Sequence, residues 1–282
     1  MKATDYITKE KPTWCAGCSN FAIRSALLRA FVELGLKPHN IAMVFDIGCA
    51  GNSASWYNVY SFHGLHGRVI PVASGAKLAN KDMTVIGIGG DGGMYGEGIG
   101  HLIQVARNNI DITVIVSNNE LYSLTTGQAS PTTKKGTKTK STPEGLIEES
   151  LNPLTVAISA NAGFVARGYT GELNHLTELI KKAIQHKGFS LIDVLQPCIT
   201  IDKVHDNQWF KERIYQLDSD WNTQNKESAL KKADETDKQI PIGIIYKKQR
   251  KAYQEELEYL KNKPLVKQKH QRTVTKKILN EF

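Results

Sequence analysis

Long apolar runs are absent from this 282-residue sequence, and cysteine is scarce, with four residues. No run approaches the ~20 apolar residues that a membrane-spanning helix needs. The segment from Met1 to Pro12 also lacks the basic, apolar and cleavage-site pattern of a secretion signal. We therefore expect a cytoplasmic protein without a membrane partner, in which the cysteines do not form disulfides.

Positive charge is in excess and unevenly distributed. The formal net charge is +8, and residues 203–282 hold 18 Lys and Arg against 12 Asp and Glu. Two stretches contain no acid: Ser130 to Thr142, with Lys134, Lys135, Lys138 and Lys140, and Lys263 to Lys277. Each stretch could be a solvated loop, or it could contact an anionic substrate or an acidic electron carrier, and both interpretations stay open. Because no aromatic platform or nucleic-acid-binding module accompanies these lysines, we expect no nucleic-acid partner.

The most informative pattern is Gly90-Asp91-Gly92-Gly93, which Asn118-Asn119 follows 27 positions after Asp91. The apolar run before it, 83–89, is typical of a buried parallel strand, and helical periodicity follows it. The glycines let the backbone approach a diphosphate closely at a helix N-terminus. A second apolar strand, 112–117, would end at the same sheet edge, where oxygen ligands could complete a Mg²⁺ site. This spacing indicates thiamine diphosphate, although a Gly-Asp-Gly turn alone is common in α/β proteins.

The four cysteines fall into three segments, Cys15 with Cys18, Cys49, and Cys198. Four thiolates at element ends or in loops suit a [4Fe–4S] cluster. The Cys-x-x-Cys pair also fits a thioredoxin-type motif, but no hydrophobic strand precedes it. A Cys₄ zinc site usually has two such pairs. The thioredoxin-type motif, the zinc site and buried cysteines that bind no metal all stay open as alternatives. The cluster is favoured because the thiamine-diphosphate pattern accompanies the cysteines.

Both patterns together resemble the β subunits of the 2-oxoacid:ferredoxin oxidoreductases, especially those of 2-oxoglutarate enzymes. The similar segments extend through much of the chain and are 12–15, 46–49, 62–68, 71–80, 90–92, 108–113, 127–132 and 240–244. Several positions depart from the family, among them Ser19 and Ser123, where glycine is common in relatives. Ala16 stands where Pro is common and Gly93 where a second Asp is common. Thr126 replaces a lysine of many relatives, which leaves the contacts with coenzyme A and substrate open.

The resemblance implies specific roles for individual residues. Asp91, Asn119 and the carbonyl of Leu121 would hold Mg²⁺, and Cys15, Cys18, Cys49 and Cys198 would hold the [4Fe–4S] cluster. His63 would be the catalytic residue near the thiamine ring, with His66 as a second candidate. The residues expected to contact thiamine diphosphate are Gly48, Cys49, His63, Gly90, Asp91, Gly92, Gly93, Asn119, Leu121, Leu124 and Thr125.

The activity implied is oxidative decarboxylation of a 2-oxoacid to acyl-CoA and CO₂, with electrons passing through the cluster to ferredoxin. 2-Oxoglutarate is the favoured substrate, and pyruvate or a broader range remains open. Only the diphosphate-binding side of a thiamine enzyme is present, so we expect an α subunit that supplies the pyrimidine side, in a heterodimer or (αβ)₂. Two alternatives are a non-oxidative thiamine-dependent decarboxylase or transferase subunit with a zinc site, and a non-catalytic electron-transfer or scaffold subunit.

Alternating strands and helices predict an α/β fold with a doubly wound, mainly parallel sheet of the thiamine-diphosphate-binding type. The expected helices are near 20–34, 75–81, 97–108, 153–161 and 172–186. Strands are expected near 41–47, 83–89, 112–117, 164–168 and 190–195. The segment 62–68 is interpreted as a loop, and 124–144 as a long polar loop. Residues 1–200 are expected to form the cofactor-binding domain, and 201–282 a basic C-terminal extension that contacts other subunits.

Overall fold

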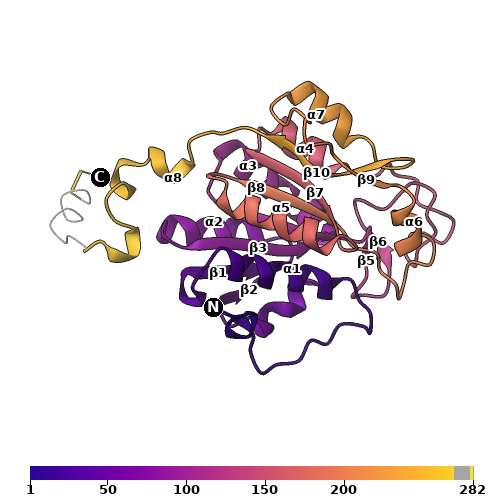
Figure 1. Cartoon of the computed structure of the whole chain (residues 1–282), viewed down its shortest axis with the longest axis horizontal. Coiled ribbons are helices and arrows are strands. Elements are labelled where there is room, and N and C mark those ends of the chain that lie inside the picture. The colour runs from indigo at the N-terminus through magenta and orange to yellow at the C-terminus, as the bar shows by residue number, and fades with distance from the viewer. Residues whose placement is uncertain (270–279, 282) are drawn as a thin grey trace.

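The computed structural model describes residues 1–269 and 280–281, and one eight-stranded sheet lies at its centre (Figure 1). The strand order is β2-β1-β3-β4-β8-β7-β10-β9, and each neighbouring pair is parallel except β7 with β10. The predicted mainly parallel, doubly wound sheet is therefore confirmed. Its strands are β1 (Ile41–Phe45), β2 (Tyr60–His63), β3 (Thr84–Gly90), β4 (Thr113–Asn118), β7 (Phe164–Tyr169), β8 (Ser190–Leu195), β9 (Ile214–Gln216) and β10 (Ile240–Lys247). A separate two-stranded sheet joins β5 (Leu121–Tyr122) to β6 (Gln128–Ala129).

Helices cover both faces of the central sheet. One face packs on α1 (Asn20–Glu33) and α5 (Leu173–Gln185). The other packs on α2 (Val69–Ala79), α3 (Ile99–Asn108), α4 (Pro153–Ser159) and α7 (Lys226–Ala233). In α5 the buried residues Leu176, Leu179, Ile180 and Ala183 follow the spacing of an amphipathic helix, which explains why this segment forms a helix against the sheet.

Short helical segments complete the described chain. They are α6 (Asn207–Lys211), α8 (Tyr253–Glu256), the 3₁₀ turns η1 (Ala3–Tyr6), η2 (Pro38–Asn40), η3 (Gly51–Trp56), η5 (Glu258–Leu260) and η6 (Leu265–Lys267), and the π-helical turn η4 (Gly92–Glu97). No helix among residues 1–269 and 280–281 is long and apolar enough to span a membrane. The basic stretch predicted at 263–277 lies outside the described residues from position 270 on.

Two boundaries differ from the sequence prediction. Helix α2 begins at Val69 rather than near Gly75, because Pro71 lies in its first turn, where a helix tolerates proline. Residues 62 and 63 of the segment interpreted as a loop belong to strand β2, which pairs in parallel with β1 at the sheet edge. All four residues of β2 are exposed, so no hydrophobic alternation marks it in the sequence.

The C-terminal part of the chain contributes to the central sheet. Strands β9 and β10 extend the sheet beyond β7, and the buried Ala229 and Ala233 of α7 join the core on one face. Pro241 and Gly243 weaken the strand pattern of β10 in the sequence, since both residues are disfavoured inside strands. The division at residue 200 and the role of 201–282 in contacts between subunits stay predictions.

Candidate active site

The site is assembled at the carboxyl ends of four strands that are neighbours in the sheet, β1, β3, β4 and β8. Cys49 follows β1, Asp91 follows β3, Asn119 follows β4, and Cys198 follows β8. Cys15 and Cys18 precede α1 and reach the same edge. Because parallel strands present their carboxyl ends on one edge, residues up to 183 positions apart in the chain meet there.

A cavity of about 260 Å³, here called the cofactor cavity, opens beside Asp91. Every residue predicted to contact thiamine diphosphate lines it, except His63. Its walls are formed by Ile47, Gly48, Cys49, Ala50, His66, Gly90, Asp91, Gly92, Gly93, Ser117, Asn119, Leu121, Tyr122, Ser123, Leu124 and Thr125.

Asp91 is a buried carboxyl surrounded by hydrogen-bond donors. Ser130 Oγ lies 2.5 Å and Thr132 Oγ1 2.9 Å from Asp91 Oδ2, and the backbone N–H of Asn119 donates to Oδ1 at 3.4 Å. Burial raises the pKa of Asp91 to about 6, and the donors oppose this rise. A buried carboxyl held in this way is suited to bind a cation. No sequence pattern predicted a role for Ser130 or Thr132, although both lie in the family-like segment 127–132.

The side chain of Asn119 is oriented by its own partners. Its Oδ1 accepts hydrogen bonds from the backbone N–H of Leu121 at 3.2 Å and from Ser123 Oγ at 3.0 Å, and its Nδ2 donates to Gln196 Oε1 at 3.1 Å. These contacts direct the amide oxygen toward the backbone of Leu121 and the amide nitrogen toward Gln196. Such supporting hydrogen bonds are what position a ligand for a metal ion.

The glycines after Asp91 are required by close packing. A Cβ atom on Gly92 would lie 2.2 Å from Tyr122 Cε1, and one on Gly93 would lie 1.8 Å from Asp46 Oδ2. Both residues belong to η4, the π-helical turn that follows Asp91. Gly92 and Gly93 also line the cofactor cavity, and glycines at a helix N-terminus allow a diphosphate to approach the main chain closely.

The two histidines of the predicted loop have different surroundings. His66 lines the cofactor cavity, with Nδ1 3.4 Å from Asp46 Oδ1 and Nε2 3.4 Å from Glu97 Oε2. Asp46 is fully buried, and burial raises its pKa. His63 is exposed at the end of edge strand β2 and does not line the cavity. The catalytic role predicted for His63 stays a prediction.

All four cysteines line a second cavity of about 270 Å³, here called the cysteine cavity. None of the four forms a disulfide. Burial, and to a smaller extent the other three cysteines, raise the pKa of Cys49 to about 11. Trp14 Nε1 donates to the carbonyl of Cys49 at 2.6 Å and thereby ties the Cys15 segment to the loop after β1. The structure thus brings together the four sulfurs that the sequence separates, which suits an electron-deficient group that accepts thiolates.

The two cavities adjoin one another. Cys49, Asn119, Ser123 and Leu124 line both. Within residues 1–269 and 280–281, no three His, Cys, Asp or Glu side chains converge on one ion position. Neither predicted ligand set requires three such side chains around one ion. The Mg²⁺ ligands include a single carboxylate, and a [4Fe–4S] cluster takes one thiolate per iron.

Two family models match this sequence in consecutive segments. The model "Thiamine pyrophosphate enzyme, C-terminal TPP binding domain" matches residues 46–194, which include the cofactor cavity. A model of the C-terminal region of the pyruvate ferredoxin oxidoreductase beta subunit matches residues 198–262. The segment that follows β8, including β9 and β10, thus has a counterpart in a family of redox enzymes.

Known proteins of similar sequence and structure agree with these matches. A 2-oxoacid:ferredoxin oxidoreductase subunit beta of Saccharolobus solfataricus is 46% identical over 246 residues, 83% of this chain and 81% of the relative. Subunit beta of 2-oxoacid:ferredoxin oxidoreductase 1 of Aeropyrum pernix is 41% identical over 252 residues, 86% and 79% of the two chains. A solved 2-oxoglutarate:ferredoxin oxidoreductase from Magnetococcus marinus, with 2-oxoglutarate, coenzyme A and succinyl-CoA bound, superposes with a TM-score of 0.92 at 30% identity, over 99% of this chain and 96% of the other.

Proposed function

Because the chain belongs to the β subunits of the 2-oxoacid:ferredoxin oxidoreductases, we propose that it oxidatively decarboxylates a 2-oxoacid to acyl-CoA and CO₂ and passes the electrons to ferredoxin. We favour 2-oxoglutarate as the substrate, since the solved enzyme of similar structure binds it. Pyruvate or a broader range of 2-oxoacids is the alternative.

One observation carries this proposal: the cofactor cavity and the cysteine cavity share a wall formed by Cys49, Asn119, Ser123 and Leu124. A decarboxylation that also releases electrons requires an acceptor close to the reacting carbon. A cluster held by Cys15, Cys18, Cys49 and Cys198 would lie directly behind that wall. A thiamine enzyme without electron transfer has no need for this arrangement.

In the cofactor cavity, Asp91, Asn119 and the carbonyl of Leu121 would hold Mg²⁺ and, through it, the diphosphate. When bound, thiamine diphosphate supplies the electron sink that allows CO₂ to leave a 2-oxoacid. Ser130 and Thr132 hold the Asp91 carboxyl in place, and Gln196 orients the amide of Asn119. The apolar side chains of Leu121 and Leu124 form part of the cavity wall.

His66 is the histidine that this chain places against the cofactor cavity, between the carboxylates of Asp46 and Glu97. An imidazole between two carboxylates is suited to hold and transfer a proton. His63 lies on the exposed edge strand, so it could approach a cofactor only where a second chain completes the site. His63 and His66, the first and second candidates from the sequence, thus remain in competition, and the position of His66 favours it in the isolated chain.

The partner is proposed to be an α subunit that supplies the pyrimidine side of the thiamine site, in a heterodimer or (αβ)₂. Ferredoxin is the proposed electron acceptor and coenzyme A the acyl acceptor. These assignments rest on the family and on the coenzyme A and succinyl-CoA named for the solved enzyme.

The test is anaerobic co-purification with the partner subunit, followed by measurement of iron, sulfide, zinc and thiamine on one sample. We expect about four irons and four sulfides per chain, bound thiamine diphosphate, and reduction of ferredoxin that depends on both the 2-oxoacid and coenzyme A. Thiamine with zinc and without sulfide would instead identify a non-oxidative decarboxylase or transferase subunit. Iron and sulfide without thiamine would identify an electron-transfer subunit.

A further inference from the structure

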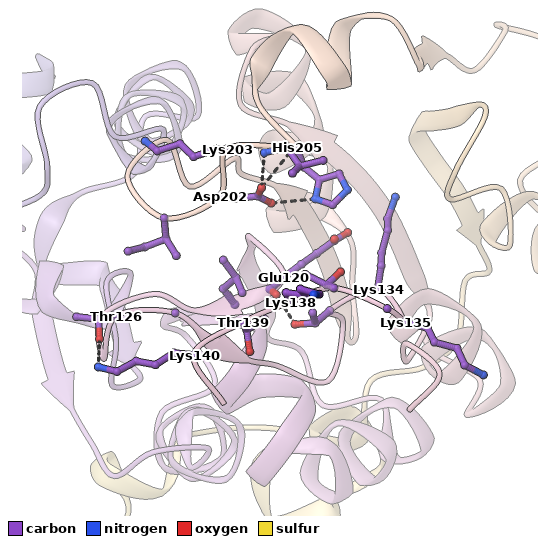
Figure 2. A pocket seen from close by; sticks show the side chains of 17 residues that line it. Glu120, Thr126, Lys134, Lys135, Lys138, Thr139, Lys140, Asp202, Lys203 and His205 are labelled. Carbon is purple, nitrogen blue, oxygen red and sulfur yellow. Dashed lines mark hydrogen bonds and ion pairs between the residues drawn. The ribbon is translucent and has the colours of Figure 1, made fainter. Parts of the chain in front are cut away.

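A third cavity of about 760 Å³, here called the basic cavity, adjoins the cysteine cavity (Figure 2). Thr126 and Ile201 line both cavities. The charged side chains of the basic cavity are two acids, Glu120 and Asp202, the imidazole of His205, and the five lysines Lys134, Lys135, Lys138, Lys140 and Lys203. Positive charge is therefore in excess here, next to the proposed redox site.

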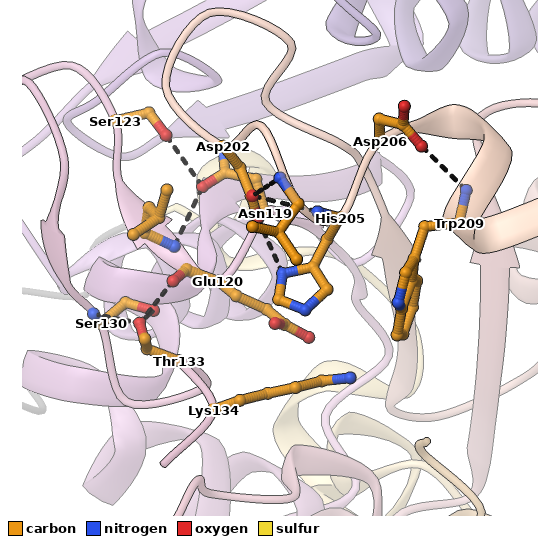
Figure 3. A network of polar contacts seen from close by, with 12 residues as sticks. Asn119, Glu120, Ser123, Ser130, Thr133, Lys134, Asp202, His205, Asp206 and Trp209 are labelled. Carbon is orange, nitrogen blue, oxygen red and sulfur yellow. Dashed lines mark hydrogen bonds and ion pairs between the residues drawn. The ribbon is translucent and has the colours of Figure 1, made fainter. Parts of the chain in front are cut away.

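Several of these charges already have partners. Lys135 forms an ion pair with Glu149 and points away from the centre of the cavity. Asp202 lies 2.9 Å from His205 Nδ1. Lys134 lies over the ring of Trp209 at 4.2 Å and is 3.8 Å from Asp237. Figure 3 shows the side chains of Glu120, Lys134 and His205 facing one another.

Lys140 differs from these side chains because its partner is neutral. Its Nζ donates to Thr126 Oγ1 at 2.8 Å (Figure 2), and no carboxylate within the described residues forms an ion pair with it. An ammonium group has three donors, so two remain for a ligand. The contact also brings the charge of Lys140 to the wall between the basic cavity and the cysteine cavity.

The backbone around this contact is well fixed. The N–H of Lys140 donates to the carbonyl of Gly127 at 3.2 Å, and Ser141 Oγ accepts from the N–H of Ala129 at 3.0 Å. Thr126 adopts a left-handed conformation with φ 77°, and its N–H donates to the carbonyl of Ser123 at 3.1 Å. The lysine-containing segment 130–142 is therefore attached to the turn 121–127, and this turn contributes residues to each of the three cavities.

We propose that Lys140 binds an oxyanion of a substrate at this junction, with Thr126 as its positioning residue. The inference rests on the proposed function and adds a specificity-determining residue to it. Two substrates carry a suitable oxyanion: 2-oxoglutarate has a second carboxylate, and coenzyme A has phosphates. Either would form charge-assisted hydrogen bonds with the two remaining donors of Lys140.

The test compares Lys140→Met with Lys135→Met in the enzyme assembled with its partner subunit. Both substitutions remove one lysine charge from the same loop and cavity, but only Lys140 contacts Thr126. Steady-state rates are measured with 2-oxoglutarate, with pyruvate and with varied coenzyme A. We expect Lys140→Met to raise the KM for 2-oxoglutarate or the KM for coenzyme A by about tenfold, as for loss of a charge-assisted hydrogen bond. Lys135→Met is expected to leave both KM values unchanged.

The pattern of the change identifies the oxyanion. A higher KM for 2-oxoglutarate but not for pyruvate assigns Lys140 to the second carboxylate. A higher KM for coenzyme A with both acids assigns it to the phosphates. Equal KM values in Lys140→Met and Lys135→Met overturn the inference. Adding Thr126→Lys to Lys140→Met returns a charge to the same wall and is expected to restore the KM.

A binding measurement separates this inference from the proposed function. Calorimetry with 2-oxoglutarate and with coenzyme A is carried out on the same three proteins: parent, Lys140→Met and Lys135→Met. If the parent oxidises no 2-oxoacid but binds one of these anions through Lys140, the proposed function fails and the inference stands. If the parent binds neither anion, the inference fails whatever the activity.

Discussion

At the scale of single residues, Asp91 shows how the fold prepares a charge for a ligand. Its carboxyl is 1% exposed and already has Ser130 and Thr132 as donors. Burial raises the pKa of Asp91 to about 6 because the ionised form loses its hydration. A bound divalent cation would compensate the ionised carboxylate for this lost hydration and lower its pKa again.

We expect Asp91→Asn to lose binding of thiamine diphosphate with Mg²⁺, while the iron and sulfide content stays at that of the parent. The amide keeps the size of the carboxyl but removes the charge that the cation requires. Calorimetric titration of thiamine diphosphate, with iron analysis of the same sample, checks this. The exposed Asp82→Asn is the control. Equal thiamine affinity in Asp91→Asn and the parent would refute the Mg²⁺ assignment.

The two histidines give a second prediction at this scale. His66→Gln is expected to lower kcat by about 10²-fold or more, the contribution typical of a residue that transfers protons, because His66 lines the cofactor cavity. His63→Gln tests the role predicted from the sequence in the same assay of the assembled enzyme. A loss of kcat in His63→Gln alone would show that the partner subunit brings His63 to the site and that His66 is structural.

Acid stability depends on another single residue, His186. It is 4% exposed, and burial lowers its pKa to about 4. The unfolded imidazole has a pKa of about 6.5, so the folded state resists protonation. Stability is then full above pH 6.5 and is lost as the pH falls toward 4, with a loss of about 2 kcal/mol at pH 5.

We therefore expect His186→Leu to remove this part of the pH dependence. The measurement is denaturant unfolding of parent and variant at pH 7.5 and pH 5. The parent should lose more stability between these values than the variant does. His39→Leu is the control, because His39 is exposed. Equal losses in parent and His186→Leu would show that His186 is protonated without cost in the folded chain.

At the scale of elements, the turn η4 depends on glycine. Gly92→Ala places a methyl group 2.2 Å from the ring of Tyr122, so the turn has to move. Gly100 lies in α3 with nothing within 4 Å of an added Cβ, and Gly100→Ala is the matched control. We expect Gly92→Ala to lose thiamine diphosphate binding and Gly100→Ala to keep it with equal or higher thermal stability.

The readout combines thiamine titration with a thermal unfolding curve. If Gly92→Ala unfolds at the temperature of the parent and binds thiamine diphosphate equally well, the close approach of η4 is not needed for the diphosphate. If Gly92→Ala fails to fold, the substitution Tyr122→Leu is added to it. Leucine at position 122 leaves room for the methyl group and is expected to recover the fold.

The elements also explain what the sequence could predict. Strands β3, β4 and β8 are buried, mainly apolar runs, and Asp91, Asn119 and Cys198 follow them, so the sequence could predict that these three residues lie at one edge of the sheet. Strand β2 is exposed and carries no alternation, and β10 contains Pro241, so neither was predicted. The contact between Lys140 and Thr126 depends on how the segment 130–142 folds back, which no local pattern encodes.

At the scale of the whole molecule, one edge of the sheet carries exposed apolar side chains. Tyr60 and Phe62 of β2 and the nearby Leu65 are 63%, 54% and 78% exposed. Edge strands of this kind usually pair with or pack against another surface. His63 lies on the same strand, three residues before His66, which lines the cofactor cavity. This is the face on which we expect the α subunit to bind.

We expect the double variant Phe62→Ser and Leu65→Ser to weaken association with the partner subunit while the isolated chain keeps its fold. Size-exclusion chromatography of the co-expressed pair measures the association. Ile147→Ser is the control, since Ile147 is 81% exposed in the polar loop after β6. If only the Ile147 variant dissociates, the partner binds elsewhere.

The four neighbouring strands β1, β3, β4 and β8 also set a spacing. Adjacent strands lie ~4.8 Å apart, so the three intervals between the loops that carry Cys49 and Cys198 amount to about 14 Å, fixed by backbone hydrogen bonds. Loop residues such as Thr126 and Lys140 can change in evolution without altering this distance. Relatives with different preferences among 2-oxoacids could thus inherit one arrangement of the cysteine-bearing loops and diversify only at its rim.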